Sequence, residues 1–304
     1  MYYGTKKVYS FLENGNQGGA ECHELTELNV TENGTYEGAF GVVNVDVPQE
    51  GSSSNSTFSE IGWTSEDDTT VFGDAIAYAK EIYDNWDATA NDVSSRWRDN
   101  ARIMFFPNVD WSNIEYANIT FYGCKSLVGV PDIVAPKLWF ATEVFNGCSA
   151  LQKAPMIYTD KIDNFYRFFY DCKNLRYVPQ YNTSVATSVS EMFAQCTSLT
   201  SLPLYDFNNV GDIWSLFGGE ELYNLTDLGG FANLKIDWND DGGLVKLPNL
   251  TYDSIMNVIN NLYDFRGNGD NDTTRTLKIH PNTMALLSDE DKQIATNKGW
   301  TLTE

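Results

Sequence analysis

Four cysteines of this chain, Cys124, Cys148, Cys172 and Cys196, stand 24 residues apart. Phenylalanine, leucine and proline keep the same interval, so that the unit F-x-x-C-x-x-L-x-x-x-P occurs four times. The other columns are Phe121, Phe145, Phe169 and Phe193; Leu127, Leu151, Leu175 and Leu199; and Pro131, Pro155, Pro179 and Pro203. A unit of this size cannot bury its apolar side alone, so successive units have to stack and share one core.

The period of 24 residues falls in the range of leucine-rich repeats. We therefore predict an α/β repeat, a short leucine-rich-repeat solenoid over residues 100–235, with an N-terminal β module and an α+β C-terminal cap. The phenylalanine, cysteine and leucine columns form its core ladder. On the strand side of such a stack, neighbouring units lie about 4.8 Å apart.

The stretch Met192–Pro203 resembles the bacterial surface-antigen type of leucine-rich repeat, whose units read MF-x-x-C-x-x-L-x-x-L/I-P. The resemblance covers residues 100 to 235. It implies adhesion or recognition and not catalysis, at a bacterial surface or on a phage particle.

The cysteine column has two interpretations. A row of metal-binding or redox-active thiols is one, and a ladder of buried, unreactive thiols is the other. We favour the second, because free cysteine is among the most buried residue types and a spacing of 24 is unlike that of metal-binding cysteine pairs. Cys22 lies outside the column, and an odd number of cysteines suits a reducing cytosol.

The first 50 residues predict two short β segments. Residues 1–18 are interpreted as a docking segment, with Tyr2, Tyr3, Lys6, Val8 and Phe11 as its contact residues. They resemble the Y-x-G-x-K-K-V segments of phage tail and fibre proteins; a frayed or self-paired terminus is the alternative. Residues 19–50 alternate apolar and polar side chains around a turn at Asn33-Gly34, which predicts a β-hairpin connector module.

The stretch from Leu28 to Tyr36, which closes with Val43–Val47, resembles the V-T-E-N-G-T-Y … V-x-V-x-V modules of fibre and tail proteins of gut phages and of bacterial surface proteins. Together with the repeats, it resembles virion accessory proteins of gut Bacteroides phages. Residues 51–99 then predict a linker and an amphipathic helix over 69–87 that caps the first unit, with partner binding or self-association as the alternative role.

Residues 236–304 no longer follow the 24-residue repeat and are predicted to form the C-terminal cap. Thr251 and Ser288 are expected to begin helices, the second running through Lys298. Residues 274–279 and 300–302 are expected to form strands, and His280-Pro281 to end the first of them.

Two acidic loops resemble parts of calcium-binding sequences. The loop Asp237–Gly242 matches the first half of a calcium-binding EF-hand loop, but position 12 is Pro248 instead of glutamate. The loop Asn268–Asp272 has a similar composition. Both are interpreted as acidic turns. No catalytic, cofactor-binding or metal-binding residue is assigned, and no cofactor is expected.

Aromatic residues near the prolines offer a possible contact surface. Trp139, Tyr158, Tyr181 and Tyr205 are the candidates for stacking on sugars or docking on proteins. We assign the last three to one column and favour a buried ladder for it.

The net charge of −22 argues against nucleic acid and against anionic membranes as partners. The chain shows no apolar run of 18 residues and no leader after Met1, which favours assembly in a host cytoplasm.

Together these features favour a structural virion protein of a bacteriophage, a non-enzymatic head or tail fibre component that assists host attachment. Its expected partners are capsid, tail or fibre subunits, further copies of itself, and a host-surface glycan or protein. A bacterial cell-surface adhesin module is the alternative, and a carbohydrate-active enzyme ranks last.

Overall fold

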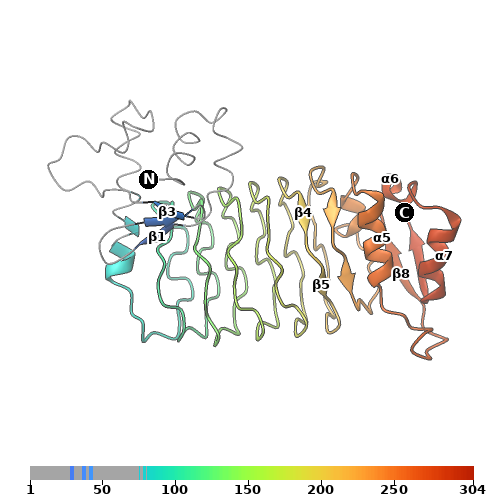
Figure 1. Ribbon diagram of the computed structural model, residues 1–304, viewed down its shortest axis with the longest axis horizontal. Coiled ribbons are helices and arrows are strands. Elements are labelled where there is room, and N and C mark those ends of the chain that lie inside the picture. The colour runs from blue at the N-terminus through green and yellow to red at the C-terminus, as the bar shows by residue number, and fades with distance from the viewer. Residues whose placement is uncertain (1–27, 31–35, 39–40, 44–74, 76–77, 80) are drawn as a thin grey trace.

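The structure is a computed structural model that describes residues 28–30, 36–38, 41–43, 75, 78–79 and 81–304. Most of the molecule is a row of narrow units placed side by side, and helices and a small sheet lie at the C-terminal end (Figure 1). The five residues expected to dock, Tyr2, Tyr3, Lys6, Val8 and Phe11, lie outside the described residues, as does the linker between residues 44 and 74.

The N-terminal module contains a strand that the hairpin prediction missed. Strands β1 (Leu28–Val30), β2 (Tyr36–Gly38) and β3 (Gly41–Val43) form an antiparallel sheet in the order β1-β2-β3. β1 and β2 pair on either side of Asn33-Gly34, where a hairpin turn is expected, and β3 adds a third strand on the other edge of β2. In the sheet, Tyr36 pairs with both Val30 and Val43.

The described residues of the predicted capping helix are helical at 75, 78–79 and 81–84. Ala79 and Ile82 are buried, as the amphipathic pattern predicts. Trp86 follows and stacks on Trp97 with ring centroids 6.0 Å apart. This segment therefore lies against the N-terminal end of the aromatic core.

The units stack in parallel with a register of one period. Asp92 bridges to Tyr116 and Tyr116 bridges to Phe140, each pair being 24 residues apart. Backbone N–H groups of one unit donate to carbonyls of the next, as from Phe121 to Val144 at 2.9 Å. Asp92 already bridges to the following unit, so the stack begins before residue 100. Its start therefore lies inside residues 51–99, which the sequence assigned to the linker and capping helix.

Regular strands are short within the stack. They comprise β4 (Ser201–Leu202), β5 (Tyr205–Asp206), β6 (Asp227–Leu228) and β7 (Phe231–Ala232), which pair in parallel as β4-β6 and β5-β7. Elsewhere in the described units the contacts are single bridges, joined by turns. The prolines, which lack an N–H group, suit such brief pairing.

Two columns of residues adopt left-handed backbone angles, which let each unit turn twice within a few residues. The first column is Ser95, Ile119, Glu143, Arg167, Glu191 and Ser215, and the second is Asp99, Gly123, Gly147, Asp171, Gln195 and Gly219. At Gly123 a Cβ atom would meet the Asp99 carboxylate, so glycine leaves room for that side chain and also suits the positive φ. Ile119, by contrast, is a β-branched residue with φ at 52°.

We expect Ile119→Gly to stabilise the protein by about 1 kcal/mol, because the left-handed conformation costs an L-residue roughly 1–2 kcal/mol. The measurement is urea unfolding followed by circular dichroism. Gly147→Ala is the matched control: it has φ at 75°, and the nearest atom to a new Cβ is 3.4 Å away. It should destabilise by a similar amount. Shifts of the same sign in both variants would contradict the backbone argument.

The C-terminal elements begin where the caps predict. Helix α5 (Tyr252–Asn261) is capped by Thr251, and α7 (Asp289–Asn297) is capped by Ser288 in a reciprocal capping box with Asp291. The 3-10 helix η1 (Leu244–Lys246) precedes α5. Strand β8 (Arg275–Lys278) and helix α6 (Pro281–Met284) lie between α5 and α7, and β9 (Trp300–Thr303) follows α7. His280 caps α6 instead of ending a strand, since its ring Nδ1 accepts from the backbone of Asn282.

These elements close against the last unit of the stack. Leu228 of β6 donates its backbone N–H to the Ser254 hydroxyl of α5 at 2.9 Å. The Lys298 ammonium donates to carbonyls at the C-terminal end of α5, including that of Asn260 at 2.6 Å. A cation suits this helix end, where carbonyl groups lack partners. β8 pairs in parallel with β9, and Trp238 bridges to β8.

Candidate functional site

The twelve residues of the expected core ladder lie together in the interior. The structure gives an exposed fraction of 0% to each of Phe121, Phe145, Phe169, Phe193, Cys124, Cys148, Cys172, Cys196, Leu127, Leu151, Leu175 and Leu199. They line the stack from one unit to the next and offer no surface to a ligand. Their role is to hold the units together.

The phenylalanine column is a continuous stack of rings. Phe145 and Phe169 lie 5.5 Å apart with an interplanar angle of 7°, and Phe169 and Phe193 lie 6.1 Å apart at 3°. Trp97 continues the column at one end, 5.6 Å from Phe121. The sequence analysis missed Trp97, although it stands one period before Phe121.

The thiol column makes a second, polar ladder. The Sγ atom of each cysteine donates to a backbone carbonyl in the preceding unit, for example from Cys148 to Phe121 at 3.0 Å and from Cys172 to Phe145 at 3.1 Å. Burial raises the pKa of the Cys124 thiol to about 11 and holds the pKa of the Cys148 and Cys172 thiols well above the usual range. Thiols held in the protonated form are poor nucleophiles and poor metal ligands.

The proposed tyrosine column is wrong at one position. Tyr181 and Tyr205 are buried, and their hydroxyls donate to the carbonyls of Pro155 and Pro179. Tyr158 is 51% exposed, because the residue one period before Tyr181 is Ile157, which is buried instead. The buried column therefore contains Ile157, Tyr181 and Tyr205, and the Tyr158 side chain faces solvent instead.

The carboxylates of the two acidic loops are engaged by the chain itself. Asp240 accepts from the backbone of Ser215 and of Gly242, and Asp241 pairs with Lys278 at 2.8 Å, which lowers the pKa of Asp241. In the other loop, Asp270 accepts from the backbone of Thr273 at 2.9 Å, and these hydrogen bonds lower its pKa. Across the described residues, no group of three His, Cys, Asp or Glu side chains is placed to hold a metal ion.

Exposed aromatic rings gather at one place on the surface. Tyr116, Trp139 and Phe140, here named the aromatic platform, contact one another with centroid distances of 5.5 Å from Trp139 to each neighbour and 6.4 Å from Tyr116 to Phe140. Trp139 is 42% exposed and Phe140 39% exposed. Sequence reasoning identified Trp139 alone, although the period places Tyr116 and Phe140 in one column.

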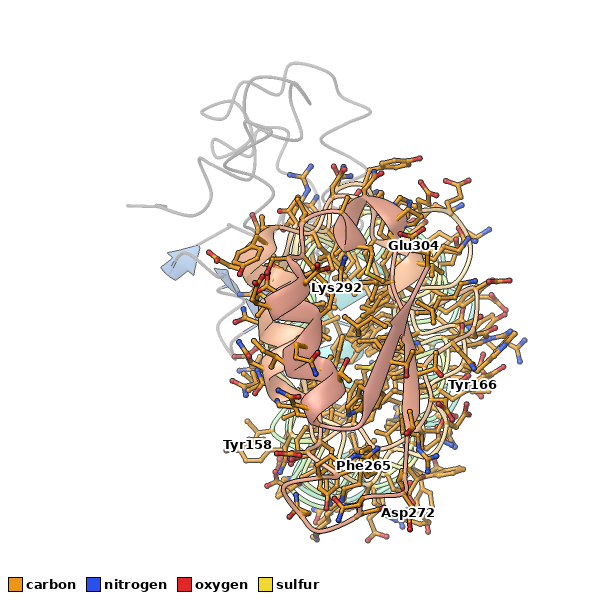
Figure 2. The ribbon with its side chains drawn as sticks, turned by 90° about the vertical axis from the view of Figure 1, so that its right-hand side faces the viewer. Tyr158, Tyr166, Phe265, Asp272, Lys292 and Glu304 are labelled. Carbon is orange, nitrogen blue, oxygen red and sulfur yellow. The ribbon has the colours of Figure 1, made fainter. Side chains whose placement is uncertain are left out.

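A second aromatic cluster surrounds a half-buried ion pair. The Arg167 guanidinium lies over the rings of Tyr166 and Tyr170, at 5.0 and 4.9 Å, and pairs with the Glu191 carboxylate. The Glu191 side chain is 9% exposed. Figure 2 looks along the stack and shows Tyr166 on the opposite side of the molecule from Tyr158. The two sides of the stack thus carry different side chains.

The apolar patch on the Tyr158 side is mixed in composition. It contains Val134, Met156 and Tyr158, which are between 42% and 56% exposed. Val134 and Tyr158 occupy the same position in neighbouring units, beside the bridge between Ile133 and Ile157. The Asp132 carboxylate accepts the backbone N–H of Met156 at 2.7 Å at the edge of this patch.

None of the helices in the described part of the chain has the length and hydrophobicity needed to span a membrane. No protein-family model matches the chain, and neither the curated proteins nor the solved structures contain a significant match to it.

Proposed function

We propose that this chain is a structural virion protein of a bacteriophage, a head or tail fibre component that displays a leucine-rich-repeat slab. The order of segments is the observation that carries the proposal: a docking segment, a V-T-E-N-G-T-Y module, 24-residue repeats and a closing α+β segment. The fold class is part of the proposal and is supported by the one-period register between Tyr116 and Phe140.

The physical properties of the stack suit a display element. A core of stacked rings and hydrogen-bonded thiols leaves the described units without a reactive group in their interior. Rigid units of this kind present side chains at fixed intervals over an extended surface. A protein of this type acts by contact instead of catalysis.

The N-terminal module supports assembly with other chains. Strands of three residues, such as β1 and β3, form sheets of marginal stability by themselves, so pairing with further strands stabilises them. The proposal therefore includes a homo-oligomer and contacts with capsid, tail or fibre subunits.

The first test is on particles of the phage that encodes the chain. We expect the chain to co-purify with the capsid protein through a density gradient at a constant ratio, and antibodies against residues 100–235 to label intact particles. Deletion of residues 1–18 should remove the chain from particles. Trp214→Ala, which truncates a side chain 58% exposed, is the control and should leave incorporation unchanged. Absence from purified particles, with labelling of the bacterial envelope, would favour the adhesin alternative.

A further inference from the structure

We propose that the aromatic platform of Tyr116, Trp139 and Phe140 binds neutral polysaccharide. This inference deepens the proposed function, since it names the class of host-surface molecule that a displayed slab would contact.

The rings form a closed surface and not a cage. Trp139 contacts Tyr116 and Phe140 at 5.5 Å, so the space between the rings is already filled by the rings themselves. A cage for an ammonium group needs an open centre between its aromatic walls. A sugar instead lays the C–H face of its ring on an aromatic face, which an exposed indole provides.

Acidic residues occupy the position of Trp139 in the units before and after it. Glu115 precedes Tyr116, and its backbone carbonyl accepts the N–H of Trp139 at 3.2 Å, which sets the two residues side by side. Asp163 occupies the position of Trp139 in the following unit. Ionised carboxylates only accept hydrogen bonds, so they suit sugar hydroxyls as donors.

Charge selects against anionic sugars at this site. The chain has a net charge of −22, and two of the residues in the column of Trp139 are acidic. Lys137 donates its Nζ to the neutral Asn113 side chain at 2.7 Å and Lys161 stands one period later, so the selection against anions comes from the charge of the whole chain. A neutral polysaccharide avoids the electrostatic repulsion that the carboxylates of uronic or sialic acids would meet.

The platform is held in place before any ligand arrives. Tyr116 and Phe140 are joined by a parallel bridge, and the N–H groups of Trp139 and Phe140 both donate to the Glu115 carbonyl. Rings fixed by their backbone lose little conformational entropy on binding. The patch of Val134, Met156 and Tyr158 has no such group of contacting rings, and we assign no saccharide to it.

The test is affinity electrophoresis of the full chain in gels containing neutral β-glucan, α-mannan or galactan, with anionic polygalacturonate in a parallel gel. We expect retardation by at least one neutral polymer and none by polygalacturonate. Trp139→Ala should weaken the apparent affinity about tenfold, since an aromatic contact of roughly 1.4 kcal/mol corresponds to that factor.

Trp214→Ala is the matched control, because it removes an indole that is more exposed than Trp139 and lies outside the platform. It should keep the affinity of the parent chain. Retardation by polygalacturonate alone, equal retardation of the Trp139→Ala variant, or no retardation by the three neutral polymers would overturn the inference. Such a result would leave the virion role intact, since incorporation into particles is measured separately.

Discussion

Replacing Phe169 by alanine is expected to destabilise the protein by about 4 kcal/mol, the range observed for fully buried phenylalanines. Phe169 lies in the middle of the ring stack, between Phe145 and Phe193, and has no exposed surface. The cavity would open at two unit interfaces at once, because the ring contacts both neighbours. The measurement is urea unfolding monitored by circular dichroism and tryptophan fluorescence.

The control for this prediction is Phe140→Ala. Phe140 belongs to the unit before that of Phe169 and lies on the surface, where its side chain is 39% exposed. The substitution removes contacts with Tyr116 and Trp139 but leaves no enclosed cavity. We therefore expect it to lower the free energy of unfolding by less than about 1.5 kcal/mol. If the two variants unfold at similar urea concentrations, the ring stack is not the main stabilising element of the repeat region.

Raising the pH from 8 to 10 should produce the second large effect, a loss of several kcal/mol of stability. Thiols of the unfolded chain ionise near pH 8.5, whereas burial raises the pKa of Cys148 and Cys172 well above that and the pKa of Cys124 to about 11. Between these values the unfolded state has lost protons that the folded state keeps.

The sign of this effect follows from the proton balance. The free energy of unfolding falls with pH wherever the unfolded state binds fewer protons, by about 1.4 kcal/mol per pH unit for each thiol. The thiols therefore leave stability unchanged well below pH 8.5 and reduce it progressively above. Tyr181 and Tyr205, whose pKa values burial also raises, add to the loss only above about pH 10.

The variant that isolates the thiols is Cys148→Ser with Cys172→Ser. Serine retains a donor for the carbonyls of Phe121 and Phe145 but does not ionise in this range. We expect the fall in stability between pH 8 and 10 to become shallower by about 2.7 kcal/mol per pH unit at its steepest. The same pH dependence in the variant and the parent would show that the thiols are not the cause.

The period of 24 residues was enough to recognise which residues are equivalent, and most of those equivalences are interior ones. Phe169 and Leu175 are buried in the structure because the same apolar side chain recurs at the same place in each unit. Similarly, the helix starts after Thr251 and Ser288 are local signals, since a hydroxyl bonds to a backbone N–H only three residues ahead.

The outward-facing residues could not be assigned in this way. Tyr158 was placed in the buried tyrosine column by its similarity to Tyr181, yet it is one residue out of register and points to solvent. The left-handed turn at Ile119 was missed because β-branched residues rarely adopt it. The platform was missed as a group, although Trp139 was noted.

The sequence by itself determined the repeat interval, the equivalent positions and the caps of the two long C-terminal helices, because these depend on side-chain chemistry within one unit or one helical turn. Only the tertiary structure decided which surface rings meet, as Trp139 does with Tyr116, and which thiol bonds to which carbonyl. Those contacts join residues about one period apart, and they depend on how the backbone turns between units, which no single unit encodes.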